Sequence, residues 1–167
     1  MKHKVLKKQN NSRMCLVCGM KNDLGAKASF YELDNGELVA EFSAKEEHQS
    51  YPGRMHGGII ASVLDETLGR VIMISEPDCW AVTMELKTRY LKPVPLCHDL
   101  RVIARVKKNS SIMFEAEGEM ILPDGQIAVT ASGKYMKMRL PQITTAELFE
   151  FDWHQDTSKP IPQDIEI

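Results

Sequence analysis

The sequence predicts an α+β fold in which an antiparallel sheet of about six strands packs around one long helix. One observation is a stretch from Gly57 to Ser75 that contains no proline and repeats apolar residues at helical spacing. The other is a set of extended stretches, which after the helix are joined by hairpin turns. No internal repeat interrupts this pattern.

The predicted helix begins in an unusual way, because it follows a Pro52-Gly53 turn and opens with adjacent glycines at Gly57 and Gly58. The first N–H groups of a helix have no partner inside it. They lie at the positive end of the helix dipole and suit an oxygen that carries negative charge. An oxyanion hole for acyl transfer can be built from such backbone groups alone.

Further along the same helix, Asp65 falls at the edge of the apolar arc, among small and apolar neighbours. Glu66 points about 100° away and precedes Arg70 by four residues, which predicts a solvated ion pair. A partly desolvated carboxylate has a raised pKa and is a better proton acceptor, so Asp65 is the candidate base. The alternative is that Asp65 caps or pairs with a local group.

Gly58 and Asp65 are seven residues apart, or roughly 10 Å along a helix axis. The glycine donors and this carboxylate are therefore too far apart to act on one carbonyl within one helix. If both are catalytic, one comes from a second copy of the chain. This predicts a symmetric homodimer with two equivalent sites at its interface.

These residues resemble a known family. His56-Gly57-Gly58 with Asp65 nine positions after the histidine, preceded by residues 47–53 and by Cys15-Leu16-Val17-Cys18-Gly19, is similar to the PaaI-like hotdog-fold acyl-CoA thioesterases, in the branch with a Cys-x-x-Cys-Gly opening. The resemblance covers about residues 14–138. It implies a hotdog fold, in which the sheet wraps the helix and two sheets pair in the dimer.

The resemblance also implies roles. A backbone N–H at the Gly57 position polarises the thioester carbonyl, and the acid at the Asp65 position, from the partner subunit, serves as general base or nucleophile. A hydroxyl at the Thr83 position helps to hold the attacking water in some members. Gly58, Ser50 and Glu66 are the expected substrate-contacting positions. Ser50 stands where relatives often have glycine or asparagine, which changes the pocket upstream of the helix.

His56 is expected to orient the turn before the helix. It is also the second candidate for the general base, because imidazole titrates near neutrality. The predicted reaction is hydrolysis of an acyl-CoA thioester, with CoA as part of the substrate and no cofactor. The alternatives are a non-catalytic acyl-CoA sensor and a hotdog hydratase or dehydratase. Acyl-chain preference and the choice between a dimer and a dimer of dimers stay open.

The chain is expected to be one domain over residues 1–167. Residues 1–13 are rich in lysine and are predicted to be a frayed basic tail. Residues 141–167 form a C-terminal extension in which a short helix starts near Thr144. Its apolar anchors are Phe149, Phe151 and Trp153.

Among the strands, residues 33–37 predict a hairpin whose second strand turns Leu38, Ala40 and Phe42 to one face. Residues 80–90 alternate so that Val82, Met84 and Leu86 share one face and Thr83 the other. Residues 100–107 and 112–121 carry rows of arginine and glutamate that predict cross-strand ion pairs, and residues 126–138 close the sheet.

Composition excludes several function classes. The net charge is −2 without a clustered basic face, which argues against nucleic acid. No apolar run reaches the length of a membrane span, and the start lacks a signal peptide, so a cytoplasmic protein is expected. Cys15 and Cys18 supply half of a zinc motif, but Cys79 and Cys97 do not complete it. No metal site and no redox dithiol are expected, and the two thiols of the turn are predicted to pack against the core.

Overall fold

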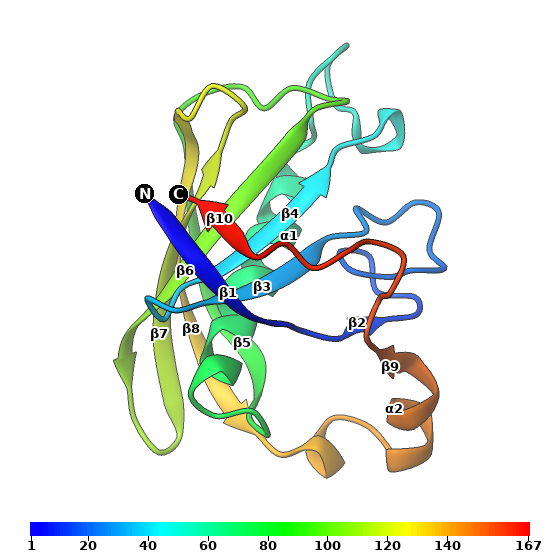
Figure 1. Cartoon of the computed structure of the whole chain (residues 1–167), viewed down its shortest axis with the longest axis vertical. Helices are drawn as coiled ribbons and strands as arrows, with labels where there is room; N and C mark the ends of the chain where they lie inside the picture. Colours follow the sequence, from blue (N-terminus) through cyan, green and yellow to red (C-terminus); the bar gives the residue numbers. More distant parts are fainter.

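The computed structural model describes residues 1–167. A long helix, α1 (Gly57–Arg70), continues as one 3-10 turn, η2 (Val71–Ile74), and confirms the predicted helix. An eight-stranded antiparallel sheet curves around it, as the hotdog fold requires (Figure 1). The strand order is β10 (Asp164–Glu166), β1 (Lys2–Lys8), β3 (Ser29–Leu33), β4 (Leu38–Ser43), β6 (Asp99–Asn109), β7 (Met113–Ile121), β8 (Ile127–Met138) and β5 (Trp80–Tyr90). The remaining elements are β2 (Asn11–Ser12) paired with β9 (Trp153–His154), the 3-10 turns η1 (Glu46–His48) and η3 (Leu140–Gln142), and the short helix α2 (Ala146–Asp152).

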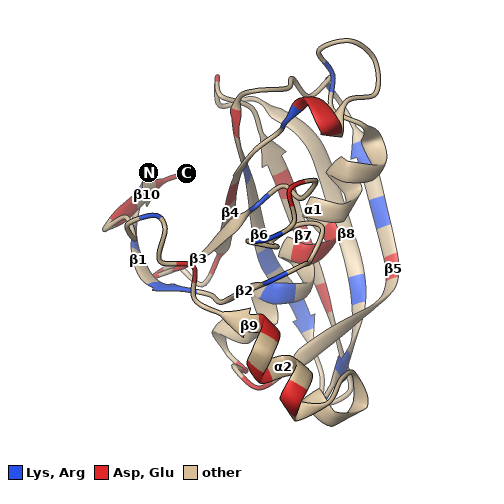
Figure 2. Cartoon of the chain, turned by 90° about the vertical axis from the view of Figure 1, so that its right-hand side faces the viewer, with Lys and Arg blue, Asp and Glu red and all other residues tan.

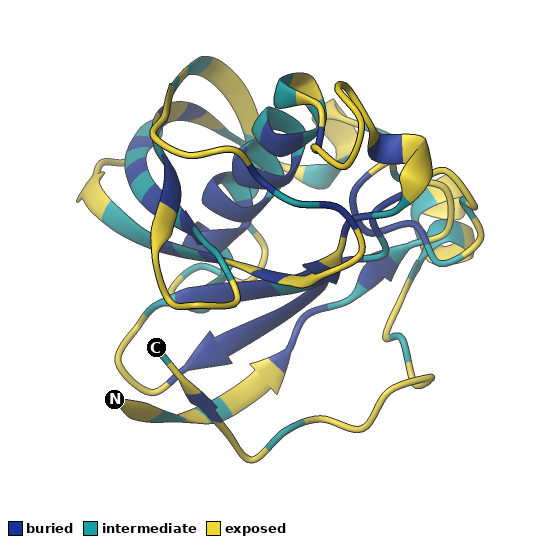
Figure 3. Cartoon of the chain, turned by 90° about the horizontal axis from the view of Figure 1, so that it is seen from above, coloured by how far each residue is buried: buried dark blue, intermediate teal, exposed yellow.

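The core lies between α1 and the concave face of the sheet. Buried residues concentrate on the helix and on the strands around it (Figure 3). Leu38, Ala40 and Phe42 face this core, as the alternation in the sequence predicts. The helix contributes fully or almost fully buried side chains to the same cluster: Ile60, Val63, Leu64 and Leu68. Removing these apolar side chains from water holds the helix against the sheet.

The two chain ends correct the prediction of a frayed tail. Residues 2–8 form β1, which pairs with β3 on one side and with β10 on the other. The termini lie side by side (Figure 1), and the Ile167 N–H donates to the Met1 carbonyl at 2.9 Å. The reason is that the β3–β4 hairpin is apolar on its outer face too. On that face Ile165 of β10 forms a second buried cluster with Tyr31, Leu33 and Val39 of the hairpin, and Val5 of β1 packs against this cluster. The six predicted strands therefore become eight.

The C-terminal extension packs beside the start of β5. Its short helix α2 is capped by Thr145, whose hydroxyl accepts the Leu148 N–H, and this confirms the predicted helix. Phe149 and Trp153 pack edge-on against Trp80, with ring centroids 4.9 and 5.1 Å apart. The third predicted anchor, Phe151, does not join this cluster. It is 63% exposed, and the Arg13 guanidinium lies 4.8 Å from its ring centroid.

Strand β5 departs from the simple alternation expected for it. A register shift between Thr83 and Glu85 inserts an extra residue against β8. Thr83 then points to the helix, and so does Leu86 three residues later, whereas Val82 and Met84 are exposed. The prediction that Val82, Met84 and Leu86 share one face is wrong, because a bulge reverses the facing of all residues beyond it.

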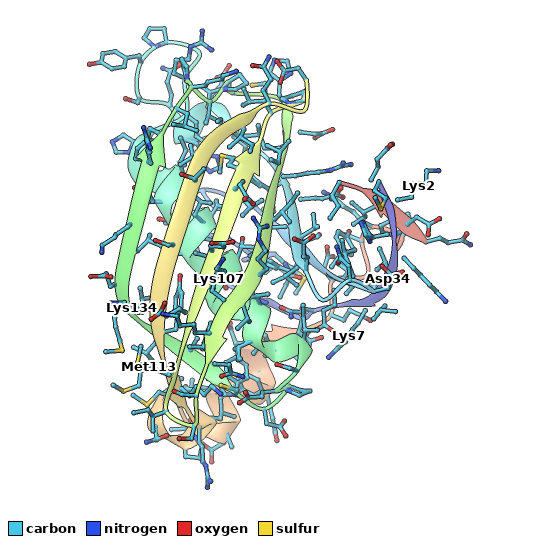
Figure 4. All side chains as sticks on the ribbon, turned by 90° about the vertical axis from the view of Figure 1, so that its left-hand side faces the viewer. Lys2, Lys7, Asp34, Lys107, Met113 and Lys134 are labelled. Carbon is cyan, nitrogen blue, oxygen red and sulfur yellow. The ribbon has the colours of Figure 1, made fainter.

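The outer face of the sheet carries the predicted ion pairs. Figure 4 views this face, with Lys107 and Lys134 on it, and Figure 2 shows acidic and basic residues along the strands. Lys107 lies 3.4 Å from Glu117, and Arg105 lies 3.1 Å from the same carboxylate. Such exposed pairs add little stability, but they favour one strand register. Neither α1 nor any other helix is long and apolar enough to cross a membrane.

Candidate active site

Asp65 meets two hydroxyl groups from two different strands. Thr83 Oγ1 of β5 lies 3.0 Å from each carboxylate oxygen. The Tyr135 hydroxyl of β8 donates to Oδ1 at 3.1 Å. A threonine hydroxyl has one hydrogen, so it donates to only one oxygen at a time. The carboxylate is thus oriented by neutral donors and keeps lone pairs for another proton.

The electrostatics of Asp65 follow from this environment. Burial raises its pKa, the hydrogen bonds from Thr83 and Tyr135 oppose the shift, and the charge of Glu66 adds to it. The net shift is upward, as the sequence predicted. No cation pairs with Asp65, so the carboxylate is a stronger base than an exposed aspartate.

Tyr135 is a residue that the sequence analysis missed. Its ring is buried and stacks on Phe114 at 5.1 Å. Burial and the Asp65 charge raise the pKa of its hydroxyl, which therefore stays a proton donor to the carboxylate. A Cβ at Gly133 would lie 2.5 Å from the ring, so only glycine leaves room for it. The sequence did hold a signal for Tyr135. Gly133 lies inside the same predicted strand, two residues earlier and therefore on the same face, and a glycine inside a strand often marks a close contact.

A cavity of about 170 Å³ opens at the carboxylate. It is smaller than the several hundred Å³ of common ligand sites. A second hollow of about 630 Å³ shares Met73, Trp80 and Trp153 with it. The aromatic cluster around Trp80 therefore stands between Asp65 and the larger hollow, and the small cavity cannot enclose an acyl-CoA.

His56 is the N-cap residue of α1, at the end of the helix where Gly57 and Gly58 lie. Its Nδ1 accepts the Gly58 N–H at 2.9 Å, which occupies that donor and leaves the Gly57 N–H without a partner in the chain. The Gly57 carbonyl accepts a hydrogen bond from the Tyr90 hydroxyl at 2.7 Å. A Cβ on Gly57 would meet only ordinary contacts, so the packing of the chain itself does not require glycine there.

Of the two remaining candidate residues, Glu66 also lines the cavity at Asp65. Glu66 binds Arg70 at 2.7 Å, but this pair is not solvated as predicted, because Arg70 is only 6% exposed. Ser50 is exposed in the loop before the helix and does not line the Asp65 cavity. Three potential metal ligands, on Cys15, Cys18 and Glu66, lie within 4.8 Å of one another.

Comparisons with known proteins find similarity over the part of the chain that contains α1 and Asp65. A model of the thioesterase superfamily matches residues 52–129, which span α1 and strands β5 to β7. A protein named "putative esterase" in Saccharolobus solfataricus is 31% identical over 107 residues, covering 64% of this chain and 76% of that protein. The chain belongs to the thioesterase superfamily.

Other similar proteins and structures have a lower sequence identity to this chain. Acyl-coenzyme A thioesterase 13 of Homo sapiens is 26% identical over 78 residues, and this chain spans only 56% of its length. A crystal structure of a thioesterase superfamily protein superposes with a TM-score of 0.68 at 27% identity, covering 74% of this chain and 60% of that one. A Streptococcus mutans protein bound to acetyl CoA superposes with a TM-score of 0.56 at 21% identity, covering 62% and 82%, which shows the fold alone.

Proposed function

We propose that this member of the thioesterase superfamily hydrolyses an acyl-CoA thioester to a carboxylic acid and CoA, as a homodimer of the PaaI-like group. The observation that carries the proposal is Asp65, a carboxylate with a raised pKa that is oriented by two hydroxyl groups and paired with no cation. The names of two similar proteins agree with it, because one is an acyl-coenzyme A thioesterase and another holds acetyl CoA.

In the proposed reaction, the free Gly57 N–H at the positive end of α1 binds the thioester carbonyl oxygen. Asp65 accepts a proton from a water molecule as that water attacks the carbonyl carbon. The carbon–sulfur bond of the tetrahedral intermediate then breaks, and the CoA sulfur takes the proton from Asp65. A variant of this scheme has Asp65 attack directly, and water then hydrolyses the mixed anhydride.

Two features of one protomer support a shared site. Gly57 and Asp65 are eight residues apart on one helix, about 12 Å along its axis. Strand β5, which carries Thr83, is the last strand of the sheet and so has one unpaired edge. Such an edge pairs readily with another strand. Its exposed apolar residues, with the one that follows it, favour a second copy as that partner: Val82, Met84, Tyr90 and Leu91.

His56 is the weaker candidate for the base, because its Nδ1 already accepts the Gly58 N–H as the helix cap. The same contact argues against the hydratase alternative, which needs His56 and a carboxylate to converge on a carbon–carbon bond.

The activity is tested by following thiol release from a panel of aliphatic and aromatic acyl-CoA esters of increasing length. We expect turnover of at least one ester without added metal. Binding of a CoA ester without release of thiol from any panel member would contradict hydrolysis and favour the sensor alternative.

The shared site is tested by mixing Asp65→Asn, which lacks the base, with Gly57→Val, whose side chain should block access to the Gly57 N–H although a Cβ there makes only ordinary contacts in the chain. We expect each variant alone to be inactive. Random reassociation gives about half heterodimers, each with one intact site of two, so about a quarter of the parent activity returns if the site spans two chains. Each variant alone is the control. Absence of recovery after verified subunit exchange would place both groups in one chain.

A further inference from the structure

The Cys-x-x-Cys turn between β2 and β3 is tightly built and is not used by the proposed hydrolysis. The Gly19 N–H donates to the Cys15 carbonyl at 2.9 Å and closes the turn. A Cβ on Gly19 would lie 2.3 Å from that oxygen, so glycine is required there. The turn holds the sulfur atoms of Cys15 and Cys18 within 4.8 Å of each other.

The two thiols differ in access. Cys15 is partly exposed, and its Sγ accepts the Val17 and Cys18 N–H groups at 3.3 and 3.4 Å. A hydrogen bond from the Cys18 thiol is the largest cause that lowers the pKa of Cys15 to about 7, against the opposing effects of burial and of Glu66. A thiol of this kind is an accessible nucleophile at neutral pH.

Cys18 is the inner member of the pair, with no exposed surface. The same hydrogen bond and its burial raise the pKa of its thiol. Its Sγ accepts the Ser12 N–H at 3.3 Å and lies 3.1 Å from Nη2 of Arg70. A partly exposed nucleophilic thiol beside a second thiol can form a mixed disulfide and then resolve it by thiol–disulfide exchange.

Arg70 also decides against a metal at this cluster. Its guanidinium binds the Cys18 sulfur and the Glu66 carboxylate, two of the three potential ligands, and stacks between the Phe30 and Trp153 rings. A cation placed among these ligands would meet a fixed positive charge at short range. Arg70 therefore already neutralises the negative charge with which these side chains would bind a metal ion.

We propose that Cys15 and Cys18 form a redox-active dithiol that reacts with low-molecular-weight disulfides. The Cys15 thiolate attacks one sulfur of the disulfide, forms a mixed disulfide and releases one thiolate. Cys18 then loses its proton to that thiolate and attacks the Cys15 sulfur. The second leaving group departs as a thiolate and takes up from solvent the proton that Cys15 had lost. The products are a Cys15–Cys18 disulfide and two small thiols, so two protein thiols are oxidised while one disulfide is reduced.

The prediction that the two thiols pack against the core is confirmed, because Cys18 belongs to the buried cluster and Cys15 packs against it. The proposal adds a redox role to this packing and does not depend on hydrolysis. It is tested on the full chain in a Cys79→Ser, Cys97→Ser background, incubated with oxidised glutathione, quenched in acid and analysed by mass spectrometry. We expect loss of two hydrogens at the Cys15–Cys18 peptide, fully reversed by reduced glutathione.

Two further variants identify the steps. Cys18→Ser should trap a glutathione mixed disulfide on Cys15, whereas Cys15→Ser should stay unmodified because the remaining thiol is buried. The proposal is overturned if no disulfide forms even in pure oxidised glutathione, or if Cys18→Ser gains no adduct while circular dichroism shows it folded. It is overturned equally if the purified chain holds one zinc ion that Cys15→Ser releases.

Discussion

Asp65 and Glu66 are neighbours in the sequence, yet they face two different regions of the molecule. Asp65 meets the hydroxyl groups of Thr83 and Tyr135 and has a raised pKa. Glu66 meets the guanidinium of Arg70 at 2.7 Å. The step of 100° around one helix therefore separates a carboxylate that can accept a proton from one whose charge is neutralised by a structural ion pair.

The difference shows why burial alone does not identify a carboxylate that can act as a base. Both carboxylates are partly buried, but Glu66 contacts the Arg70 guanidinium, whereas only neutral donors contact Asp65, and they do not cancel the effect of burial on its pKa. Arg70 belongs to the structural region, because it also binds the Asn10 carbonyl at 2.8 Å and the Cys18 sulfur.

The largest expected effect is on turnover. Asp65→Asn should lower kcat for acyl-CoA hydrolysis by about 10²–10⁴-fold, the range typical of a lost general base. The matched variant Glu66→Gln should keep most of the turnover but lower the melting temperature, because it leaves the buried Arg70 with a weaker partner. Thiol release and thermal unfolding measured on both variants test the comparison. If Glu66→Gln were the inactive one, the assignment would move to Glu66.

A smaller effect is expected from the two hydroxyl donors. Thr83→Val and Tyr135→Phe should each lower kcat by about 10- to 100-fold, because a hydrogen bond to a charged group is worth about 1.5–3 kcal/mol. Both bonds lower the pKa of Asp65, so their loss should move the acid limb of the kcat/KM profile to higher pH. Thr88→Val in the same strand is the control. An unshifted acid limb in both variants would mean that the hydroxyls do not act on Asp65.

The smallest effect is on stability. Because the folded-state pKa of Asp65 is raised, the native state binds this proton more tightly than the unfolded state does. Its contribution to stability is therefore lost as pH rises from the ordinary aspartate value, about 3.9, through the raised one. Asparagine does not titrate. The melting temperature of Asp65→Asn relative to the parent should therefore increase from pH 4 to pH 7. A constant or decreasing difference by scanning fluorimetry would contradict the raised pKa.

Much of the architecture follows from local sequence. The 3.6-residue period from Gly57, the turn at residues 34–36 and the alternation after the helix predicted α1, the β3–β4 hairpin and strands β5 to β8, because each pattern lies within one short window. The same periodicity singled out Asp65 as the acid at the edge of the apolar arc.

The tertiary structure alone decided which groups meet. The bulge in β5 that turns Thr83 to the helix and the position of Tyr135, 70 residues from Asp65, depend on strand register. The conversion of the basic tail into β1 depends on an apolar face that only the folded hairpin presents. The lowered pKa of Cys15 likewise needs the closed turn around it. Local windows encode the elements, whereas contacts between residues far apart in the chain exist only after the sheet has fixed its pairing.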